Sequence, residues 1–343
     1  MGMMISMLRT TCIAVLLFVL CPLESGAAEQ EVVAKQAAAE YPMLQLVSGE
    51  LTMRLYLPDA ERGFYRGIRF DWSGIIERVT YKGHRFYAPW KKPHDPAGND
   101  YVSGPAEEFA MSDPMGYAEA APGESFVKVG IGLLQRIDEK DYHFFGKFEL
   151  LRAGEWEVRS GGDWVEFKQD LVGERGWAYR YIKRISLGEN ESTFSIYHKL
   201  ENTGSKTIDI NHYNHNFTSI DGVPYGPDYS VTFPFSTEEP RPLRNELAWY
   251  RENRIEVVKP LGDKSTGKID LRGPGGVEFN ASTIRNNKTG AQVSFVGDVP
   301  ISEFRFWSVA AAACPEPFIQ LTIESGSSKE WSWHYTLSAD EKW

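Results

Sequence analysis

Short runs of apolar residues that alternate with polar ones recur along most of the chain, and they limit its possible folds more than any other feature. From Met43 onward these runs are separated by Gly, Pro, Asp and Asn at intervals typical of strands and turns. In many of these runs every second residue is apolar, which is typical of strands with one buried and one solvent-exposed face. The sequence therefore predicts an all-β protein, with strands over 51–57, 67–72, 75–81, 126–131, 164–167, 179–185, 194–200, 229–233, 293–295, 318–323 and 331–337.

The length of this pattern favours one large domain. An immunoglobulin-like sandwich needs only about 100 residues, whereas the strand-like runs here continue to the C-terminus without an obvious linker. We expect a single large antiparallel sandwich of two sheets over residues 29–343. Helical periodicity is nearly absent, and its best candidate is the segment 243–255. The turn-rich segments 89–123 and 236–276 are long enough to be functional loops at the rim of the sandwich.

Residues 1–28 have the layout of a secretory signal peptide. Arg9 precedes the apolar run 12–20, and the small residues 25–28 offer a cleavage site. The apolar run is too short for a comfortable membrane span, so we expect a periplasmic or secreted protein with no span after cleavage. Cys21 raises the alternative of a lipoprotein, which Leu20 disfavours because a small residue is wanted before that cysteine. An uncleaved anchor is the other alternative.

Charge and cysteine content exclude several classes of function. The formal net charge is −10, and it does not change when residues 1–28 are removed, because they hold one Arg and one Glu. An acidic chain without a basic cluster is a poor partner for nucleic acid. Cys12 and Cys21 lie in the signal segment, so Cys314 is left without a partner for an internal disulfide. No phosphate loop, dinucleotide glycine pattern or Ser–His–Asp order is present.

The polar stretch 209–222 is the candidate functional segment, since two histidines and three asparagines follow the apolar residues Ile208 and Ile210. So many polar groups are costly to bury unless they are paired or face a polar ligand. One interpretation is a structural hydrogen-bond network at a strand end, and the other is a sugar site with a histidine acid. In an extended strand His212 and His215 point to opposite faces, which makes His212 a core or orienting residue. The same alternation disfavours a metal site that combines both histidines with Asp221.

The segment from His215 to Gly222 (HNFTSIDG) resembles the His-x-Tyr-Phe-Asn-Leu-x-Gly motif of aldose 1-epimerases, the galactose mutarotases. The segment 313–317 (ACPEP) is similar to the one that carries the base glutamate of that family, and 201–207 and 323–331 resemble two of its turns. The resemblance implies a mutarotase-like supersandwich in which His215 is the acid, Glu316 is the base, and no metal or cofactor is needed. The alternative for Glu316 is an exposed carboxylate in a Pro-rich turn.

Two elements depart from the family pattern. The segment 104–109 (GPAEEF) stands where the family has Asn-Arg-Ile, so the expected substrate-binding arginine is missing there. Lys128 stands where the family has a second histidine. Carboxylates accept hydrogen bonds from hydroxyl groups, whereas Lys and Arg only donate them. Glu107, Glu108 and Lys128 are therefore candidates for altered contacts with the sugar, or the two glutamates for contact with a cation.

Four further residues are candidates for the site. Asn214 is placed to position the acid, and Asp221 to hold a sugar hydroxyl. Trp307 and Trp90 are candidate aromatic platforms for the apolar face of a sugar ring, with core packing as the alternative.

Together these observations predict an exported carbohydrate-active protein, an isomerase of the aldose 1-epimerase type that acts at the anomeric carbon by acid and base catalysis. Its partner would be a sugar or oligosaccharide. A polysaccharide lyase or glycoside hydrolase on the same fold is one alternative. A non-catalytic carbohydrate-binding protein is another, because a fold alone does not imply an activity.

Overall fold

Almost all regular structure in the described residues is β-strand, which confirms the all-β prediction. The computed structural model describes residues 41–340 except 190–191, 238, 244–245 and 272–274, so the predicted signal peptide lies outside the described residues. The helical structure in this part of the chain is one 3-10 turn at Val277–Phe279. None of its helices is long and apolar enough to span a bilayer.

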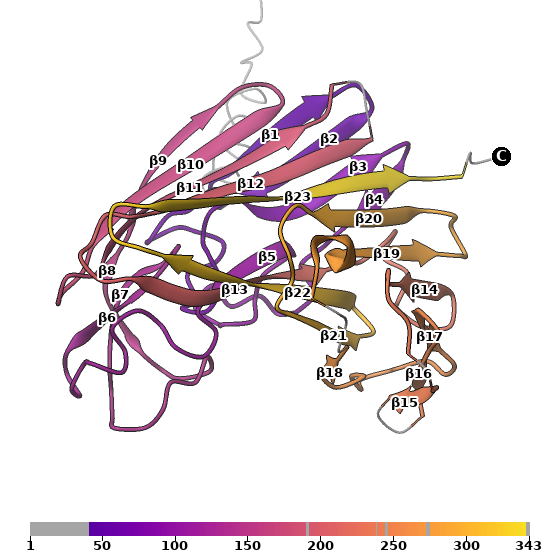
Figure 1. Ribbon diagram of the computed structural model, residues 1–343. Coiled ribbons are helices and arrows are strands. Elements are labelled where there is room, and N and C mark those ends of the chain that lie inside the picture. The colour runs from indigo at the N-terminus through magenta and orange to yellow at the C-terminus, as the bar shows by residue number, and fades with distance from the viewer. Residues whose placement is uncertain (1–40, 190–191, 238, 244–245, 272–274, 341–343) are drawn as a thin grey trace, which may run out of the picture. The chain divides into compact units, whose positions relative to one another are not determined.

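The strands form two large and two small antiparallel sheets (Figure 1). The largest sheet has the order β15 (Arg241–Leu243), β16 (Ala248–Arg251), β17 (Arg254–Val257), β14 (Tyr229–Thr232), β19 (Ala281–Asn286), β20 (Gln292–Gly297), β23 (Ser328–Ser338), β12 (Thr193–Asn202), β11 (Ala178–Leu187), β10 (Trp164–Val172) and β9 (Glu155–Ser160). The second large sheet has the order β18 (Ile269–Asp270), β21 (Glu303–Val309), β22 (Ala312–Ile323), β13 (Ile208–Phe217) and β5 (Gly104–Phe109). The small sheets are β1 (Met43–Ser48), β2 (Leu51–Tyr56), β3 (Ile75–Tyr81) and β4 (His84–Phe86), and β6 (Ser125–Lys128), β7 (Gly132–Gln135) and β8 (Glu149–Ala153).

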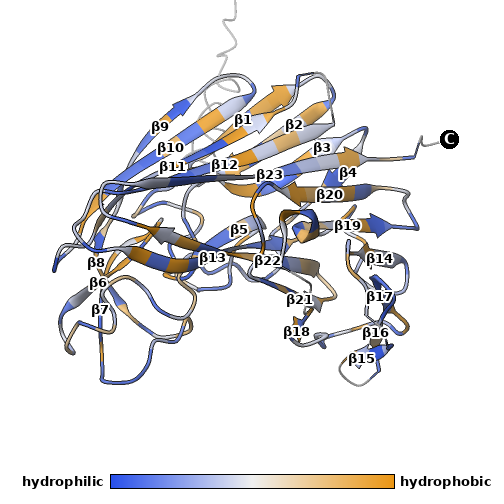
Figure 2. Ribbon diagram, viewed as in Figure 1, coloured by the Kyte–Doolittle hydropathy of each residue, from blue (hydrophilic) through white to orange (hydrophobic). Residues whose placement is uncertain are grey.

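The two large sheets pack face to face as the predicted sandwich. Strands β13 and β22 run beneath β12 and β23 (Figure 1). The His212 ring of β13 lies 5.1 Å from the ring of Trp331 and 5.3 Å from that of Trp333, both on β23. Hydropathy alternates along the strands of the largest sheet (Figure 2), because one face is buried in the sandwich and the other meets solvent.

The pairing of β13 decides which side chains form the site. On one side Tyr213 pairs with Phe318 of β22, and the same register continues to the bridge between Thr218 and Ala313. On the other side Tyr213 pairs with Glu108 of β5. Because side chains alternate along a strand, Ile208, Ile210 and His212 enter the sandwich core. Tyr213, His215 and Phe217 project from the opposite face, called the outer face below.

Three local predictions are wrong. Residues 67–72 are not a strand, because their backbone N–H groups bond to scattered acceptors: that of Asp71 donates to the Glu107 carbonyl, and that of Trp72 to the Gly130 carbonyl. The segment 243–255 is not a helix, since β16 and β17 form a hairpin in which Arg251 pairs with Arg254. The segments 89–123 and 236–276 are not only rim loops, because they contain β5 and β15 to β18.

Candidate active site

A pocket of about 240 Å³ opens on the outer face of the five-stranded sheet. Strands β13, β21 and β22 supply one wall, and five other segments of the chain supply the rest. Such concave sites, mostly apolar with a few convergent polar groups, are typical of small-ligand binding. The lining residues are Arg69, Trp90, Asp100, Met111, Phe144, Phe145, Tyr213, His215, Phe217, Lys268, Arg305, Trp307 and Glu316.

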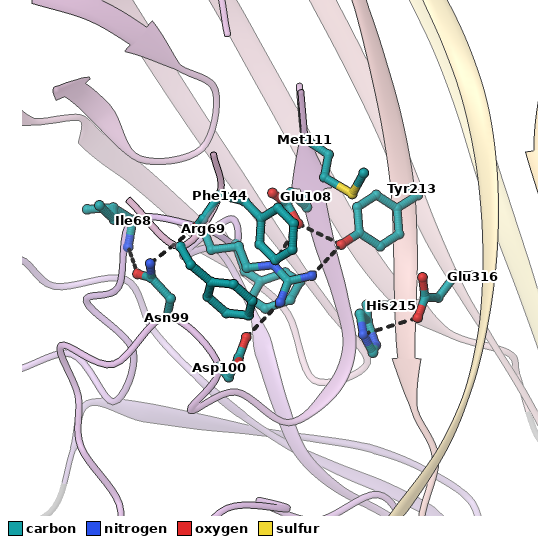
Figure 3. Close-up of polar contacts among 12 residues, drawn as sticks. Ile68, Arg69, Asn99, Asp100, Glu108, Met111, Phe144, Tyr213, His215 and Glu316 are labelled. Carbon is teal, nitrogen blue, oxygen red and sulfur yellow. Dashed lines mark hydrogen bonds and ion pairs between the residues drawn. The ribbon is translucent and has the colours of Figure 1, made fainter. Parts of the chain in front are cut away.

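His215 and Glu316 meet in this pocket (Figure 3). The register of β13 and β22 places them opposite each other, and His215 Nε2 lies 3.3 Å from Glu316 Oε1. Their side chains are only 6% and 9% exposed. Glu316 thus lies within a buried strand, and the interpretation of it as an exposed carboxylate in a Pro-rich turn is wrong.

The surroundings of His215 are aromatic. Its ring stacks on Phe217 with 3.9 Å between ring centres, and the edges of Phe70 and Trp307 complete the enclosure. Its Nδ1 atom is buried without a hydrogen-bond partner among the described residues. Burial, assisted by the positive charge of Arg69, holds the pKa of His215 well below its usual value. The His215 imidazole is therefore neutral at physiological pH.

The pKa of Glu316 is shifted in the opposite direction to that of His215. Burial raises the pKa of its carboxyl group to about 7, against the opposing influence of Arg69 and Arg305. A buried carboxyl resists ionisation because its charged form loses hydration. A single proton on the His215–Glu316 pair is therefore held by the carboxyl group in preference to the imidazole.

Arg69 is fixed in the pocket wall by three hydrogen bonds (Figure 3). Its Nε donates to Glu108 Oε2 at 2.8 Å, its Nη1 to Asp100 Oδ1 at 2.6 Å, and its Nη2 to the Tyr213 hydroxyl at 2.8 Å. The rings of Phe70 and Phe144 each lie 4.4 Å from its Cζ. A guanidinium held at every nitrogen in this way presents a positive charge in a set orientation.

Glu108 and Lys128 stand behind this wall rather than in the pocket. The Glu108 carboxylate is fully buried and accepts a hydrogen bond of 2.6 Å from the Tyr213 hydroxyl group. Lys128 Nζ lies 3.4 Å from Glu108 Oε1 and donates to the Ala110 carbonyl and to the Tyr142 hydroxyl. Burial lowers the pKa of Lys128 to about 8. These two predicted site residues support Arg69 and Tyr213 and do not line the cavity.

Glu107 and Asn214 face the sandwich core, because side chains alternate along a strand and their immediate neighbours in β5 and β13 face the other side. Glu107 forms an ion pair with Lys183 and lies 3.4 Å from His198 Nε2. Asn214 donates to the Tyr335 hydroxyl at 2.8 Å. Neither side chain lines the pocket. Both contact other buried groups of the fold instead of a ligand-binding cavity.

Of the remaining residues predicted from the sequence, two line the pocket and one lies outside it. Trp307 lines the pocket beside Trp90, with 5.5 Å between their ring centres. Asp221 lies outside it, in the turn after β13, where it accepts from the backbone N–H of Arg85 and contacts His84. Within the described part of the chain, no three His, Cys, Asp or Glu side chains are grouped so that they could hold a metal ion.

Several lining residues were not identified from the sequence. Arg69 is the most important, since it brings a cation into the pocket although β5 lacks the arginine implied by the resemblance. The segment 67–72, which contains Arg69, was predicted to be a strand, and no sequence motif identifies Arg69 as a site residue. Arg305 and Lys268 were missed for the same reason, although Arg305 pairs with Glu316 across β21 and β22 and two-residue spacing from Trp307 was a usable signal.

Comparisons with known proteins bear on the fold. No protein-family model matches the chain, and no curated protein sequence matches it. Among solved structures, the GalM/aldose epimerase homologue from C. elegans is similar with a TM-score of 0.55 and 12% identity, over 88% of this chain and 99% of that one. A galactose mutarotase-like protein from Lactobacillus casei is similar with a TM-score of 0.52 and 13% identity, over 86% and 100% of the two chains. The chain thus shares the fold of these galactose mutarotase-like and aldose epimerase-like structures.

Proposed function

We propose that this protein is a carbohydrate-active isomerase of the aldose 1-epimerase type, which interconverts the two anomers of a sugar bound in the pocket. The observation that supports it best is the buried contact of 3.3 Å between His215 Nε2 and Glu316 Oε1 in a cavity of about 240 Å³. The fold and the order of the two residues along the chain agree with the resemblance.

The reaction needs one acid and one base and no other reagent. The base removes the proton of the C1 hydroxyl, the acid protonates the ring oxygen, and the bond between C1 and the ring oxygen breaks to leave an aldehyde. Rotation about C1–C2 followed by the reverse transfers closes the ring as the other anomer. Each positioned proton transfer typically contributes about 10²–10⁴-fold.

The His215–Glu316 pair can supply both groups when it carries a single proton. Burial favours Glu316 as the holder of that proton. The roles implied by the resemblance, a carboxylate base and an imidazolium acid, require it to move across the 3.3 Å contact to His215 when the sugar binds. Both arrangements contain the same number of protons, so a pH profile reports the titration of the pair rather than of one residue.

The rest of the pocket suits a sugar ring. Arg69 offers a fixed guanidinium to the ring hydroxyls, which accept hydrogen bonds from it. Trp307, Trp90 and Phe217 supply apolar surface for the C–H faces of the ring. Export to the periplasm or the exterior is part of the proposal and depends on residues 1–28.

Polarimetry and two-dimensional exchange NMR on a panel of free aldoses test this function directly. We expect the protein to speed the approach to anomeric equilibrium for at least one sugar, with no net change in composition. Formation of an unsaturated product would instead indicate a lyase, and release of shorter sugars a hydrolase. Binding of sugars without faster exchange would contradict the proposal and favour a binding protein.

The pH dependence of exchange should follow the single proton of the pair. Activity is expected to fall as the pH rises through about 7, because Glu316 then loses the proton that the pair must hold. The acid limb should lie well below 6.5, since the pKa of His215 is depressed. Initial rates of exchange from pH 4 to 9, corrected for the spontaneous reaction, give this profile. An activity that rises through pH 7 would contradict a singly protonated pair.

A further inference from the structure

A second hollow adjoins the pocket. It has a volume of about 640 Å³, and it shares Asp100 and Phe145 with the pocket. The smaller pocket, with the His215–Glu316 pair, has room for little more than one ring. The second hollow is larger and more open, and nothing in the catalytic proposal uses it.

Hydrogen bonds of Asn99 join two segments that line the hollows (Figure 3). The Asn99 side chain accepts from the backbone N–H of Ile68 at 3.0 Å and donates to the Phe144 carbonyl at 3.1 Å. It thereby ties the segment that carries Arg69 to the loop that carries Phe144 and Phe145. Phe145, which lines both hollows, is 50% exposed.

The charge on the walls of the second hollow is positive. Arg66, Lys91 and Lys147 line it, and none of them has an ion pair with an Asp or Glu of the described residues. Arg66 donates Nη1 to the Glu61 carbonyl, while its Nε is buried without a partner. Lys91 Nζ lies over the ring of Tyr101 at 4.7 Å.

Few negative charges offset these cations. Of the acidic residues that line the hollow, Asp100 is bound to Arg69 and Glu149 is exposed. The chain as a whole has a formal net charge of −10, so a hollow with three unpaired cations departs from its average surface. Cations that line the same hollow attract an anion and raise its local concentration.

We propose that the second hollow is a subsite for an anionic group, a carboxylate or a sulfate or phosphate ester, on an oligosaccharide whose reducing-end ring occupies the catalytic pocket. This inference rests on the proposed function, and it names the substrate class. The next sugar unit extends past Phe145, and its negative charge meets Lys91, Lys147 and Arg66. The reaction at C1 is unchanged, because the chain is joined through another hydroxyl and C1 stays free.

The test compares reducing disaccharides that differ in charge. Isothermal titration calorimetry is performed with a disaccharide that carries a uronic acid, one that carries a sulfate ester, one that carries a phosphate ester, and a neutral one of the same linkage. We expect at least one anionic disaccharide to bind roughly tenfold more tightly than the neutral one at low salt, since two or three partly exposed charge contacts add up to such a factor. The difference should shrink at 0.5 M salt, because screening weakens exposed charge interactions. The three anionic ligands show which kind of anion is preferred.

The variants make the assignment specific. K91Q/K147Q should abolish most of the preference for the anionic ligand, whereas K259Q/K329Q, which removes two exposed lysines that line neither hollow, should leave it intact. The inference is wrong if no anionic ligand binds more tightly than the neutral one, or if K91Q/K147Q retains the preference.

Failure of this inference can be told apart from failure of the proposed function. If the anion preference is absent while the protein still speeds anomer exchange of neutral aldoses, only the subsite is disproved. If the preference is present while exchange is not accelerated, only the catalytic proposal is disproved. E316Q should keep the preference and lose the exchange.

Discussion

Anomer exchange should slow by about 10²–10⁴-fold when Glu316 is replaced by glutamine, because the amide can neither hold nor take up the transferred proton. Glutamine keeps the size and one hydrogen-bonding oxygen of the side chain, so the pocket should retain its shape. Polarimetric rates at pH 6.5, with ligand binding measured separately, check this outcome. Binding of the sugar should change far less than the rate.

Two companion variants sharpen this prediction. H215Q should lose a similar factor, and the double variant H215Q/E316Q should be no slower than the slower single variant, since residues that act as a unit are not additive. Glu330→Gln makes the same chemical change on an exposed position of β23 and should leave the rate unaltered. If E316Q keeps more than half of the activity, Glu316 has no part in the chemistry.

Stability gives an independent check on E316Q. The raised pKa of Glu316 means that its ionised form is disfavoured in the folded protein. The carboxyl group therefore costs stability, and this cost builds up between about pH 4.5, its ordinary pKa, and about pH 7, so that it is small at pH 5 and complete at pH 8. The neutral glutamine has no such cost. E316Q should therefore be as stable as the unaltered protein at pH 5 and more stable at pH 8, as measured by urea unfolding.

The second large effect is expected in the sandwich core, where Lys183→Met should destabilise the fold by about 3–5 kcal/mol. Lys183 is 1% exposed and forms ion pairs with Glu107 and, at 3.4 Å, with Asp71. It also donates to the Ser73 carbonyl at 2.7 Å. Methionine fills a similar volume, but it leaves two buried carboxylates without their counter-ion. Equilibrium unfolding in urea measures the loss.

The expected loss depends on pH in a defined direction. Burial already raises the pKa of Asp71 to about 6 even with Lys183 present. In K183M the Asp71 carboxyl group can become neutral by taking up a proton, so the loss should be smaller at pH 5 than at pH 8. A loss that does not vary with pH would show that packing, and not uncompensated charge, is responsible.

Lys199→Met is the matched control on the neighbouring strand β12. Lys199 Nζ lies 2.8 Å from Glu330 Oε1, but the two side chains are 34% and 51% exposed. Exposed pairs of this kind contribute about 0–1 kcal/mol. If K199M and K183M cost the same, burial of the charge would not be the cause of the larger effect.

The alternation of apolar and polar residues was enough to predict the all-β sandwich, because it follows directly from strands with one buried face. The same rule correctly separated His212, which enters the core, from His215, which lines the pocket. It also applies to Glu107 and Glu108, which are adjacent and therefore face opposite sides of β5. This was missed because β5 lies in a segment that was interpreted as a loop.

Arg69 shows why part of the site could not be predicted. Its place in the pocket depends on contacts with Asp100, Glu108 and Tyr213, which come from three other segments of the chain. No local pattern encodes such contacts. The predicted strand over 67–72 failed for the same reason, since its backbone groups bond to distant residues and not to a neighbouring strand.

The sequence by itself predicted the all-β class, many of the strands, the faces of β13 and the candidate residues at 215 and 316, because periodicity and a motif are local properties. Only the tertiary structure decided that these residues lie 3.3 Å apart, that Arg69 joins them, and that Glu107 belongs to the core. Pairing between distant strands sets these distances, and burial in the folded state sets the charges of the groups. Neither quantity exists until the chain has packed.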